Sequence, residues 1–262
     1  MKPFVELKGI MKVYGHSKSN KIAVLKDVSF SFEQGEIIGL IGASGAGKST
    51  IGKILVGLEQ QTKGSITVDG INLHTLSKKA RRQFAKNIAM IFQDPYESLS
   101  SRMKISQLIE EPLIIQKIEP DAKQREQLVR EALQVVSLDP DKYMTRYPHE
   151  LSGGERQRVG VARAFITKPK IIVADEPTSM LDTSLRLELI QLLKSMNEQF
   201  GISYVFVTHD IALTKNFCDR IIVLHEGEIV DEGPTEQVIN EPTHPFTRAL
   251  IDALLILEGA KN

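Results

Sequence analysis

The chain has 262 residues with 33 basic and 33 acidic side chains, so its formal net charge is zero. A neutral chain has no overall field that draws it to nucleic acid or to an anionic membrane surface, and we expect no nucleic-acid partner. Cys218 is the single cysteine, which excludes an internal disulfide and a cysteine-based metal site within the chain. We expect it to be a quiet core residue. The N-terminus has no apolar run of signal-peptide length, and no stretch approaches the roughly 20 apolar residues of a membrane span.

Residues 4–41 predict short strands and turns, because "FVELKGI", "LKDVSFSF" and "GEIIGLI" alternate or run apolar between glycines and polar residues. A hairpin with Asp69-Gly70 as its turn is predicted in "GSITVDGINL". A further strand is predicted in "IAMIFQ" from Ile88. We therefore expect a small antiparallel β subdomain near the N-terminus.

The β pattern stops between Asp94 and about Gly160, where an inserted helical subdomain is predicted. One helical face there carries Leu128, Val129, Ala132, Leu133 and Val136. Strands return at "KIIVAD" and "SYVFVTHD", separated by a helix with Leu185, Leu189, Leu192, Leu193 and Met196 on one side. Strands that alternate with helices predict an α/β fold with a mostly parallel sheet.

The stretch "GASGAGKST" has the spacing of a phosphate-binding loop. It lies between the predicted strand "EIIGLI" and a predicted helix with Ile51, Ile54, Leu55 and Leu58 at helical spacing. Glycines let the backbone N–H groups and the helix N-terminus point at an anion. Lys48 is expected to reach the β- and γ-phosphates of a nucleotide, and Ser49 to hold Mg²⁺. The residues assigned to the loop are Gly42, Ala43, Ser44, Gly45, Ala46, Gly47, Lys48, Ser49 and Thr50.

An acidic pair and a histidine follow two other predicted strands. Asp175 is placed to support Mg²⁺, and Glu176 to polarise the water that attacks the γ-phosphate. In isolation such a pair is often only a helix N-cap, and a lone histidine such as His209 only a core or capping residue. Because ligands bind beyond the carboxyl ends of parallel strands, we expect the loop, the acidic pair and His209 to lie at one edge.

"LSGGERQ", Leu151 to Gln157, places Ser152, Gly153 and Gly154 before a helix as a second anion-binding N-terminus. This motif resembles the signature of the ATP-binding cassette (ABC) family, a branch of the P-loop NTPases. The resemblance implies that this loop closes over the ATP of the opposite subunit in a dimer. It also implies that Tyr14 stacks on adenine, that Gln93 is the Q-loop glutamine in the metal and hydrolysis site, that "SMLD" (Ser179 to Asp182) is the D-loop, and that His209 is the switch histidine.

"FQDPYESLSSRMKI", "YPHELSGGERQRV" and "HPFTRALIDALL" are similar to the peptide and nickel importer branch of that family. The resemblance implies an ATPase that energises peptide import, with nickel or metallophore import as the alternative. It implies an ATP-binding domain over 1–240, with a core of about 1–93 and 160–240 and a helical subdomain of about 94–159, then a branch-specific extension over 241–262. The cysteine cluster that members often carry near the C-terminus is missing, which argues against an iron–sulfur cofactor and gives more weight to the nickel or metallophore members.

The partners implied are two membrane-spanning permease subunits, a second ABC ATPase subunit of different or identical sequence and, indirectly, an extracytoplasmic solute-binding protein. The location implied is peripheral, at the cytoplasmic face of the cell membrane, with ATP and Mg²⁺ as cofactors. The segment after Gln93, "DPYESLSSRMKI", is expected to grip a short helix of a membrane subunit, or else to be an ordinary linker. The rival classes are a non-transport ATPase of the same fold, a regulatory protein with a dead site, and an exporter.

Overall fold

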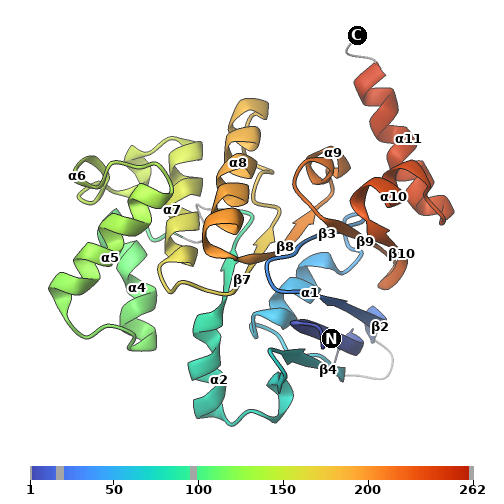
Figure 1. Cartoon of the computed structure of the whole chain (residues 1–262), viewed down its shortest axis with the longest axis horizontal. Coiled ribbons are helices and arrows are strands. Elements are labelled where there is room, and N and C mark those ends of the chain that lie inside the picture. Colours follow the sequence, from blue (N-terminus) through green and yellow to red (C-terminus); the bar gives the residue numbers. More distant parts are fainter. Residues whose placement is uncertain (1, 16–20, 95–98, 260–262) are drawn as a thin grey trace. The chain divides into compact units, whose positions relative to one another are not determined.

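The computed structural model describes residues 2–15, 21–94 and 99–259, and for residues 254–259 it describes the backbone alone. The chain forms two compact units, whose helices and strands are labelled in Figure 1. Unit 1 comprises residues 1–77 and 203–262, and unit 2 comprises residues 78–202.

The first sheet of unit 1 is antiparallel and has the strand order β2–β1–β4–β5. Its strands are β1 (Val5–Tyr14), β2 (Ile22–Phe32), β4 (Lys63–Val68) and β5 (Ile71–Asn72). At the β4–β5 turn, Asp69 and Gly70 both have positive φ angles, 50° and 75°, as a two-residue type I′ hairpin requires. The predicted antiparallel β subdomain and its hairpin are therefore confirmed.

The second set of strands in unit 1 is mostly parallel and is ordered β10–β9–β3–β8. Its strands are β3 (Ile37–Ile41), β8 (Ser203–Thr208), β9 (Arg220–His225) and β10 (Glu228–Pro234). Strand β3 is parallel to both β8 and β9, whereas β10 is antiparallel to β9. Every residue of β3 and β8 is buried, as is typical of parallel strands covered on both faces. Ile41 pairs with Thr208, so the residues that follow these two strands emerge at the same edge.

The α-helices described in unit 1 are α1 (Lys48–Leu55), α9 (Ile211–Lys215), α10 (Thr235–Asn240) and α11 (Pro245–Gly259). The prediction that Leu58 continues the apolar face of α1 is wrong, because the helix ends before it and its side chain is 60% exposed. Gly57 has a φ of 80°, its N–H bonds to the Ile54 carbonyl, and the Leu58 N–H bonds to the Lys53 carbonyl. These two bonds form a Schellman motif, which ends a helix by satisfying its last carbonyls.

Unit 2 contains the parallel strands β6 (Ile88–Ile91) and β7 (Ile171–Asp175), in which Ile91 pairs with Ala174. Its α-helices in the described residues are α2 (Lys78–Phe84), α4 (Ile105–Gln116), α5 (Ala122–Val135), α6 (Pro140–Tyr143), α7 (Gly153–Phe165) and α8 (Thr183–Phe200). Figure 1 shows α4, α5, α6 and α7 gathered in one group, coloured green to yellow. The predicted helical insertion is confirmed by this group, and with it the α/β class.

The two predicted apolar helix faces are largely buried. In α5 the buried residues are Val129, Ala132 and Leu133, and in α8 they are Leu189, Ile190, Leu192, Leu193 and Met196. Each set repeats at three- and four-residue spacing, which is the period of one helix face. Among the described residues, no helix combines the length and the apolar character that a membrane crossing requires.

Cys218 is buried in unit 1, next to Gly39 of β3. Burial, reinforced by the charge of Asp219, raises the pKa of its thiol well above the ordinary value. A buried, protonated thiol is unreactive. The prediction of a quiet core residue is confirmed in that sense.

The segment from residue 241 onward is tied to unit 1 by an apolar cluster and by one carboxylate. Ile251 of α11 packs in a cluster with Ile41 of β3 and Ile211 of α9. Asp231 of β10 accepts hydrogen bonds from the N–H groups of Thr243 and His244 at 3.0 Å and from the Thr243 hydroxyl at 2.8 Å. Burial alone would raise the pKa of Asp231, but these hydrogen bonds outweigh it and the pKa is lowered.

We expect the change Asp231→Asn to loosen the attachment of α11. The pKa of Asp231 is lower in the folded chain than the ordinary aspartate pKa of about 4. The ionised Asp231 carboxylate therefore stabilises the folded chain fully above about pH 4. This stabilisation is lost as the pH falls through the folded-state pKa. At pH 7 the variant should lose about 1–2 kcal/mol of local stability, so amide hydrogen exchange in residues 243–251 should become roughly 10-fold faster. Glu228→Gln, an exposed change on the same strand, is the matched control. Equal exchange in Asp231→Asn and the wild type would contradict this role.

Candidate functional site

The phosphate loop lies where the sequence predicts it, between β3 and α1 of unit 1. A Cβ atom at Gly42 would lie 2.1 Å from the Leu224 carbonyl oxygen of β9, and one at Gly47 would lie 2.6 Å from Leu25. At Gly42 the clash is with the backbone and cannot be relieved, and at Gly47 the φ of 105° is one that residues with a side chain rarely adopt. The two glycines therefore let the loop turn sharply against its neighbours, while Ala43, Ser44 and Gly45 between them are exposed.

Lys48 begins α1 and is only 5% exposed. Its Nζ donates hydrogen bonds to the carbonyl oxygens of Gly42 at 2.8 Å and Ala43 at 3.0 Å. The ammonium group is thus held over the loop rather than directed into solvent. Among the described residues, no side chain caps the N-terminus of α1. The positive end of α1, its first N–H groups and the Lys48 ammonium together suit a polyphosphate anion.

Ser49 and Thr50 occupy the first turn of α1 and are half-buried. Tyr14 ends β1 and is 38% exposed. The Tyr14 hydroxyl donates to Glu59 and also interacts with the Thr50 side chain. The tyrosine assigned to adenine is therefore next to the first turn of the helix that follows the phosphate loop.

His209 follows β8 and is exposed. Ile41 and Thr208 are paired across β3 and β8, so Gly42 and His209 occupy corresponding positions at the carboxyl edge of these strands. Asp210 after it accepts a hydrogen bond from the Ala212 N–H and caps α9. The cap of α9 is thus Asp210 and not His209, and His209 lies at the strand edge from which the phosphate loop also begins.

Asp175 is the last residue of the buried strand β7 in unit 2, and Glu176 follows it directly. Asp175 is 6% exposed. Glu176 has a φ of 45°, in the left-handed region that residues other than glycine seldom adopt. Such backbone conformations cost roughly 1–3 kcal/mol and concentrate at functional sites. The strained backbone conformation thus occurs at Glu176, the residue to which we assign the activation of water.

Gln93 lies two residues after β6, in the position across from Glu176. The Ile91–Ala174 pairing places it there, and its Nε2 donates to Glu176 Oε2 at 3.3 Å. The alternative that the acidic pair is only a helix cap is not supported, because Asp182 caps the helix that follows. Asp182 accepts from the Leu185 N–H, and this hydrogen bond lowers the pKa of Asp182. Within unit 2, the structure thus brings Gln93, Asp175 and Glu176 together.

The signature loop leads into α7 through a capping box. The Ser152 hydroxyl accepts from the Glu155 N–H at 3.3 Å, and Glu155 accepts from the Ser152 N–H at 2.7 Å. Tyr143 of α6 also donates to Glu155; this bond, with that of the Ser152 N–H, lowers the pKa of Glu155. These contacts fix the loop at the helix N-terminus, where an anion is favoured.

The two glycines of this loop have different environments. A Cβ atom at Gly153 would have open space within 4 Å, whereas one at Gly154 would lie 3.1 Å from Leu185 of α8. Gly154 therefore permits close packing of α7 on α8, and Gly153 leaves the backbone accessible. That Gly153 and Gly154 contact a phosphate remains a prediction.

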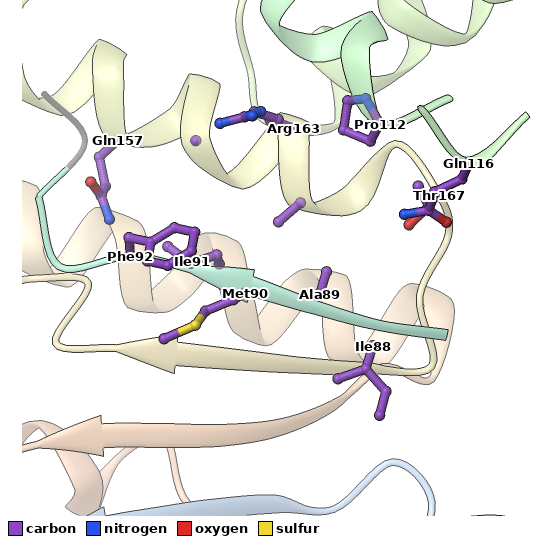
Figure 2. A pocket seen from close by; sticks show the side chains of 12 residues that line it. Ile88, Ala89, Met90, Ile91, Phe92, Pro112, Gln116, Gln157, Arg163 and Thr167 are labelled. Atoms are coloured by element: carbon purple, nitrogen blue, oxygen red, sulfur yellow. The ribbon is translucent and has the colours of Figure 1, made fainter. Parts of the chain in front are cut away.

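A groove in unit 2 is lined by Phe92, the residue before Gln93 (Figure 2). Its floor is β6 and Phe92, and its walls are α4 with Pro112 and Gln116 and α7 with Gln157 and Arg163. Gln157 is 2% exposed, and its Nε2 and the Gln116 Oε1 have no hydrogen-bond partner among the described residues. Sequence reasoning missed this groove, because its residues come from three elements far apart in the chain.

The segment after Gln93 that was predicted to grip a membrane subunit is only partly described. Residues 95–98 lie outside the described residues, and Leu99 beyond them is buried. Sequence reasoning also missed Lys12 and Glu59 beside Tyr14. Glu59 is 45 positions from Tyr14, and nothing in the spacing of either residue indicates their contact.

The site residues divide between the two units. Unit 1 holds the residues predicted to bind adenine and the phosphates and the predicted switch histidine: Tyr14, Gly42 to Thr50, and His209. Unit 2 holds the Q-loop, acidic and signature residues: Gln93, Asp175, Glu176, Ser152, Gly153 and Gly154. Each unit by itself thus brings together one chemically coherent set.

Comparisons with known proteins show the family to which the chain belongs. The family model of the ABC transporter matches residues 25–179, more than half of the chain. The chain is 40% identical over 253 residues to the oligopeptide transport ATP-binding protein OppF of Streptococcus mutans, covering 97% of this chain and 82% of that protein. It is 41% identical over 254 residues to the putative oligopeptide transport ATP-binding protein YkfD of Bacillus subtilis, covering 97% of this chain and 77% of that protein.

Solved structures of similar fold include the dimeric ATP-binding cassette MJ0796 in a post-hydrolysis state with ADP and Pi. The match has a TM-score of 0.79 at 33% identity and covers 88% of this chain and 98% of that one. A second is cbiO1 of Clostridium perfringens, part of the ABC transporter complex cbiONQ, with a TM-score of 0.80 at 25% identity and 92% of each chain covered. The chain belongs to the ABC transporter family and has the fold of its ATP-binding cassette.

Proposed function

We propose that this protein is the ATP-hydrolysing subunit of an ABC importer for peptides. The observation that carries the ATPase assignment is the strained Glu176, hydrogen-bonded to Gln93 and directly after the buried Asp175. The peptide assignment is supported by relatives at 40–42% identity, whose names describe oligopeptide transport or putative peptide import. Those names favour peptides over the nickel or metallophore cargo of the same branch.

Binding of ATP rests on unit 1. The Lys48 ammonium and the N–H groups at the start of α1 neutralise the phosphate charge, and Gly42 and Gly47 allow the loop to follow the phosphate chain. Tyr14 offers a ring face to the adenine. His209 contacts the γ-phosphate from the adjacent strand end.

Hydrolysis rests on Glu176. Its carboxylate accepts a proton from a water molecule, whose oxygen attacks the γ-phosphorus while the bond from that phosphorus to the β–γ bridging oxygen breaks. The products are ADP and inorganic phosphate. Gln93 positions the Glu176 carboxylate and the water through its amide. The Asp175 carboxylate and the Gln93 amide oxygen in unit 2, and the Ser49 hydroxyl in unit 1, are each a hard oxygen ligand of the kind that Mg²⁺ prefers, and we assign them to the metal. When bound there, Mg²⁺ would withdraw charge from the phosphate oxygens.

A second subunit completes the reaction. The signature loop, Ser152 to Gly154, is proposed to act on the nucleotide of the opposite ATPase subunit, and that subunit's loop on the nucleotide of this chain. The dimeric state of the similar cassette with ADP and Pi supports this arrangement. The second subunit is a different ATPase or another copy of this chain.

Coupling to the membrane is proposed to occur at the groove of Figure 2. Its apolar floor suits a short helix of a permease subunit, as do the Gln116 Oε1 and Gln157 Nε2 atoms, which have no hydrogen-bond partner within the described part of the chain. The groove adjoins Gln93 through Phe92. Two permease subunits would hold the protein at the cytoplasmic face of the membrane. A solute-binding protein would act on it through them.

The change Glu176→Gln should reduce ATP turnover by roughly 10²-fold or more, because the amide cannot accept the proton. It should leave ATP affinity within about 2-fold, because the phosphate loop is unchanged. Steady-state phosphate release by the assembled transporter and equilibrium ATP titration measure the two quantities. Near-normal turnover would remove Glu176 from the role of base.

Co-purified membrane subunits and the paired ATPase should raise ATP turnover of this chain well above that of the chain alone, because closure then brings in the second signature loop. Gln116→Lys, which puts a charge in the groove, should abolish most of this activation without changing ATP affinity. Gln127→Lys on the exposed face of α5 is the matched control. A chain that reaches full activity alone and gains nothing from the partners would contradict the proposal.

A further inference from the structure

The adenine-side residue Tyr14 is held by a charged cluster in unit 1. Its hydroxyl donates to the Glu59 carboxylate. The Lys12 Nζ lies 3.1 Å from Glu59 Oε2 and 4.6 Å from the centroid of the Tyr14 ring, over one face. The same ammonium donates to the Gln60 carbonyl at 2.7 Å. Lys12 and Glu59 have side chains 14% and 26% exposed, so the pair is more protected than ordinary surface ion pairs.

These contacts occupy one face of the Tyr14 ring. The Lys12 ammonium covers that face, as in a cation–π pair, while the residue as a whole is 38% exposed. The Tyr14 hydroxyl, at the far end of the ring, is bonded to a carboxylate, which is stronger than a bond between neutral groups. Burial would raise the pKa of Glu59, but its bonds to Tyr14 and Lys12 outweigh that and lower it, so the carboxylate is charged at neutral pH.

The cluster also sets where the ring lies relative to the phosphate loop. Glu59 follows the Schellman motif that ends α1, and the Glu59 N–H bonds to the Lys53 carbonyl of that helix. Helix α1 begins at Lys48, directly after the loop, and Thr50 in its first turn also interacts with Tyr14. The ring is therefore fixed to both ends of the helix that presents Lys48.

Strand β1 does not need the cluster to stay in place. The Val13 N–H donates to the Thr62 hydroxyl at 3.0 Å, and the Thr62 N–H donates to the Met11 carbonyl at 2.7 Å. Strand β1 also pairs with β2 and β4 along its length. What the cluster adds to these bonds is a fixed direction for a ring that is 38% exposed.

We propose that Lys12 and Glu59 are positioning residues that hold the Tyr14 ring, one face covered, so that the other face receives the adenine of the nucleotide. The inference rests on the proposed contact of Tyr14 with adenine. A ring fixed before binding loses less conformational entropy when the base stacks, which for one side chain corresponds to roughly 2- to 10-fold in affinity.

The test compares ADP with inorganic pyrophosphate, each titrated with Mg²⁺ onto the full-length chain by calorimetry. Both ligands bind the phosphate loop, but only ADP has a base. Glu59→Ala, Lys12→Met and Tyr14→Phe should each weaken ADP about 3- to 10-fold and leave pyrophosphate within about 1.5-fold. Glu59→Gln keeps an acceptor for the tyrosine hydroxyl and should retain ADP affinity within about 2-fold. Glu6→Ala, which removes the neighbouring β1 ion pair with Lys8, is the matched control and should change neither ligand.

The double variant Tyr14→Ala with Glu59→Ala should bind ADP no more weakly than Tyr14→Ala alone, because Glu59 acts through the ring. If Tyr14→Ala weakens ADP but Glu59→Ala does not, the positioning role is wrong and the adenine contact stands. If Tyr14→Ala binds ADP normally, the adenine contact itself is wrong. Equal loss of pyrophosphate affinity in Glu59→Ala would show that Glu59 supports the loop rather than the ring, and would also overturn the inference.

Discussion

Strands that are buried on both faces have room for charged side chains only at their ends, and the candidate site depends on that constraint. In unit 1 the buried strands β3 and β8 are paired so that Gly42 and His209 follow them at one edge. In unit 2 the pairing of β6 with β7 brings Gln93 to Glu176, and a hydrogen bond joins the two side chains. The apolar strands themselves determine which polar residues meet, because a shift of register would separate both pairs.

Local contacts and backbone conformations then fix the residues that the strands bring together. Glu176 is held in a left-handed conformation, Asp182 caps the helix that follows it, and Ser152 and Glu155 close a capping box at the signature loop. In unit 1 the Lys48 ammonium is held by the carbonyls of its own loop, and Tyr14 by Lys12 and Glu59. The residues proposed to bind the nucleotide are thus in unit 1, and those proposed to hydrolyse it or to contact a partner's nucleotide are in unit 2.

Most of this arrangement could be predicted from the sequence, because its signals are local. The phosphate loop, the acidic pair at the end of β7 and the signature loop are continuous stretches, and the strand and helix periods around them are clear. The failures concern contacts between distant positions or the geometry of helix ends. Leu58 has the right spacing for the face of α1, but a Schellman motif ends the helix before it. The cluster around Tyr14 and the packing of Gly154 on Leu185 join residues tens of positions apart, for which a single sequence has no signal.

The central claim is that one chain's phosphate loop and signature loop serve two different nucleotides. Equilibrium titration of the full-length chain with ATP, without partner subunits, tests it most directly through two variants. Lys48→Ala should weaken ATP binding roughly 10-fold or more, since a hydrogen bond from a charged donor is lost. Ser152→Arg, at an exposed position, should bind ATP with wild-type affinity, because we propose that its loop contacts only the partner's nucleotide. Loss of ATP binding in a folded Ser152→Arg chain would contradict the account.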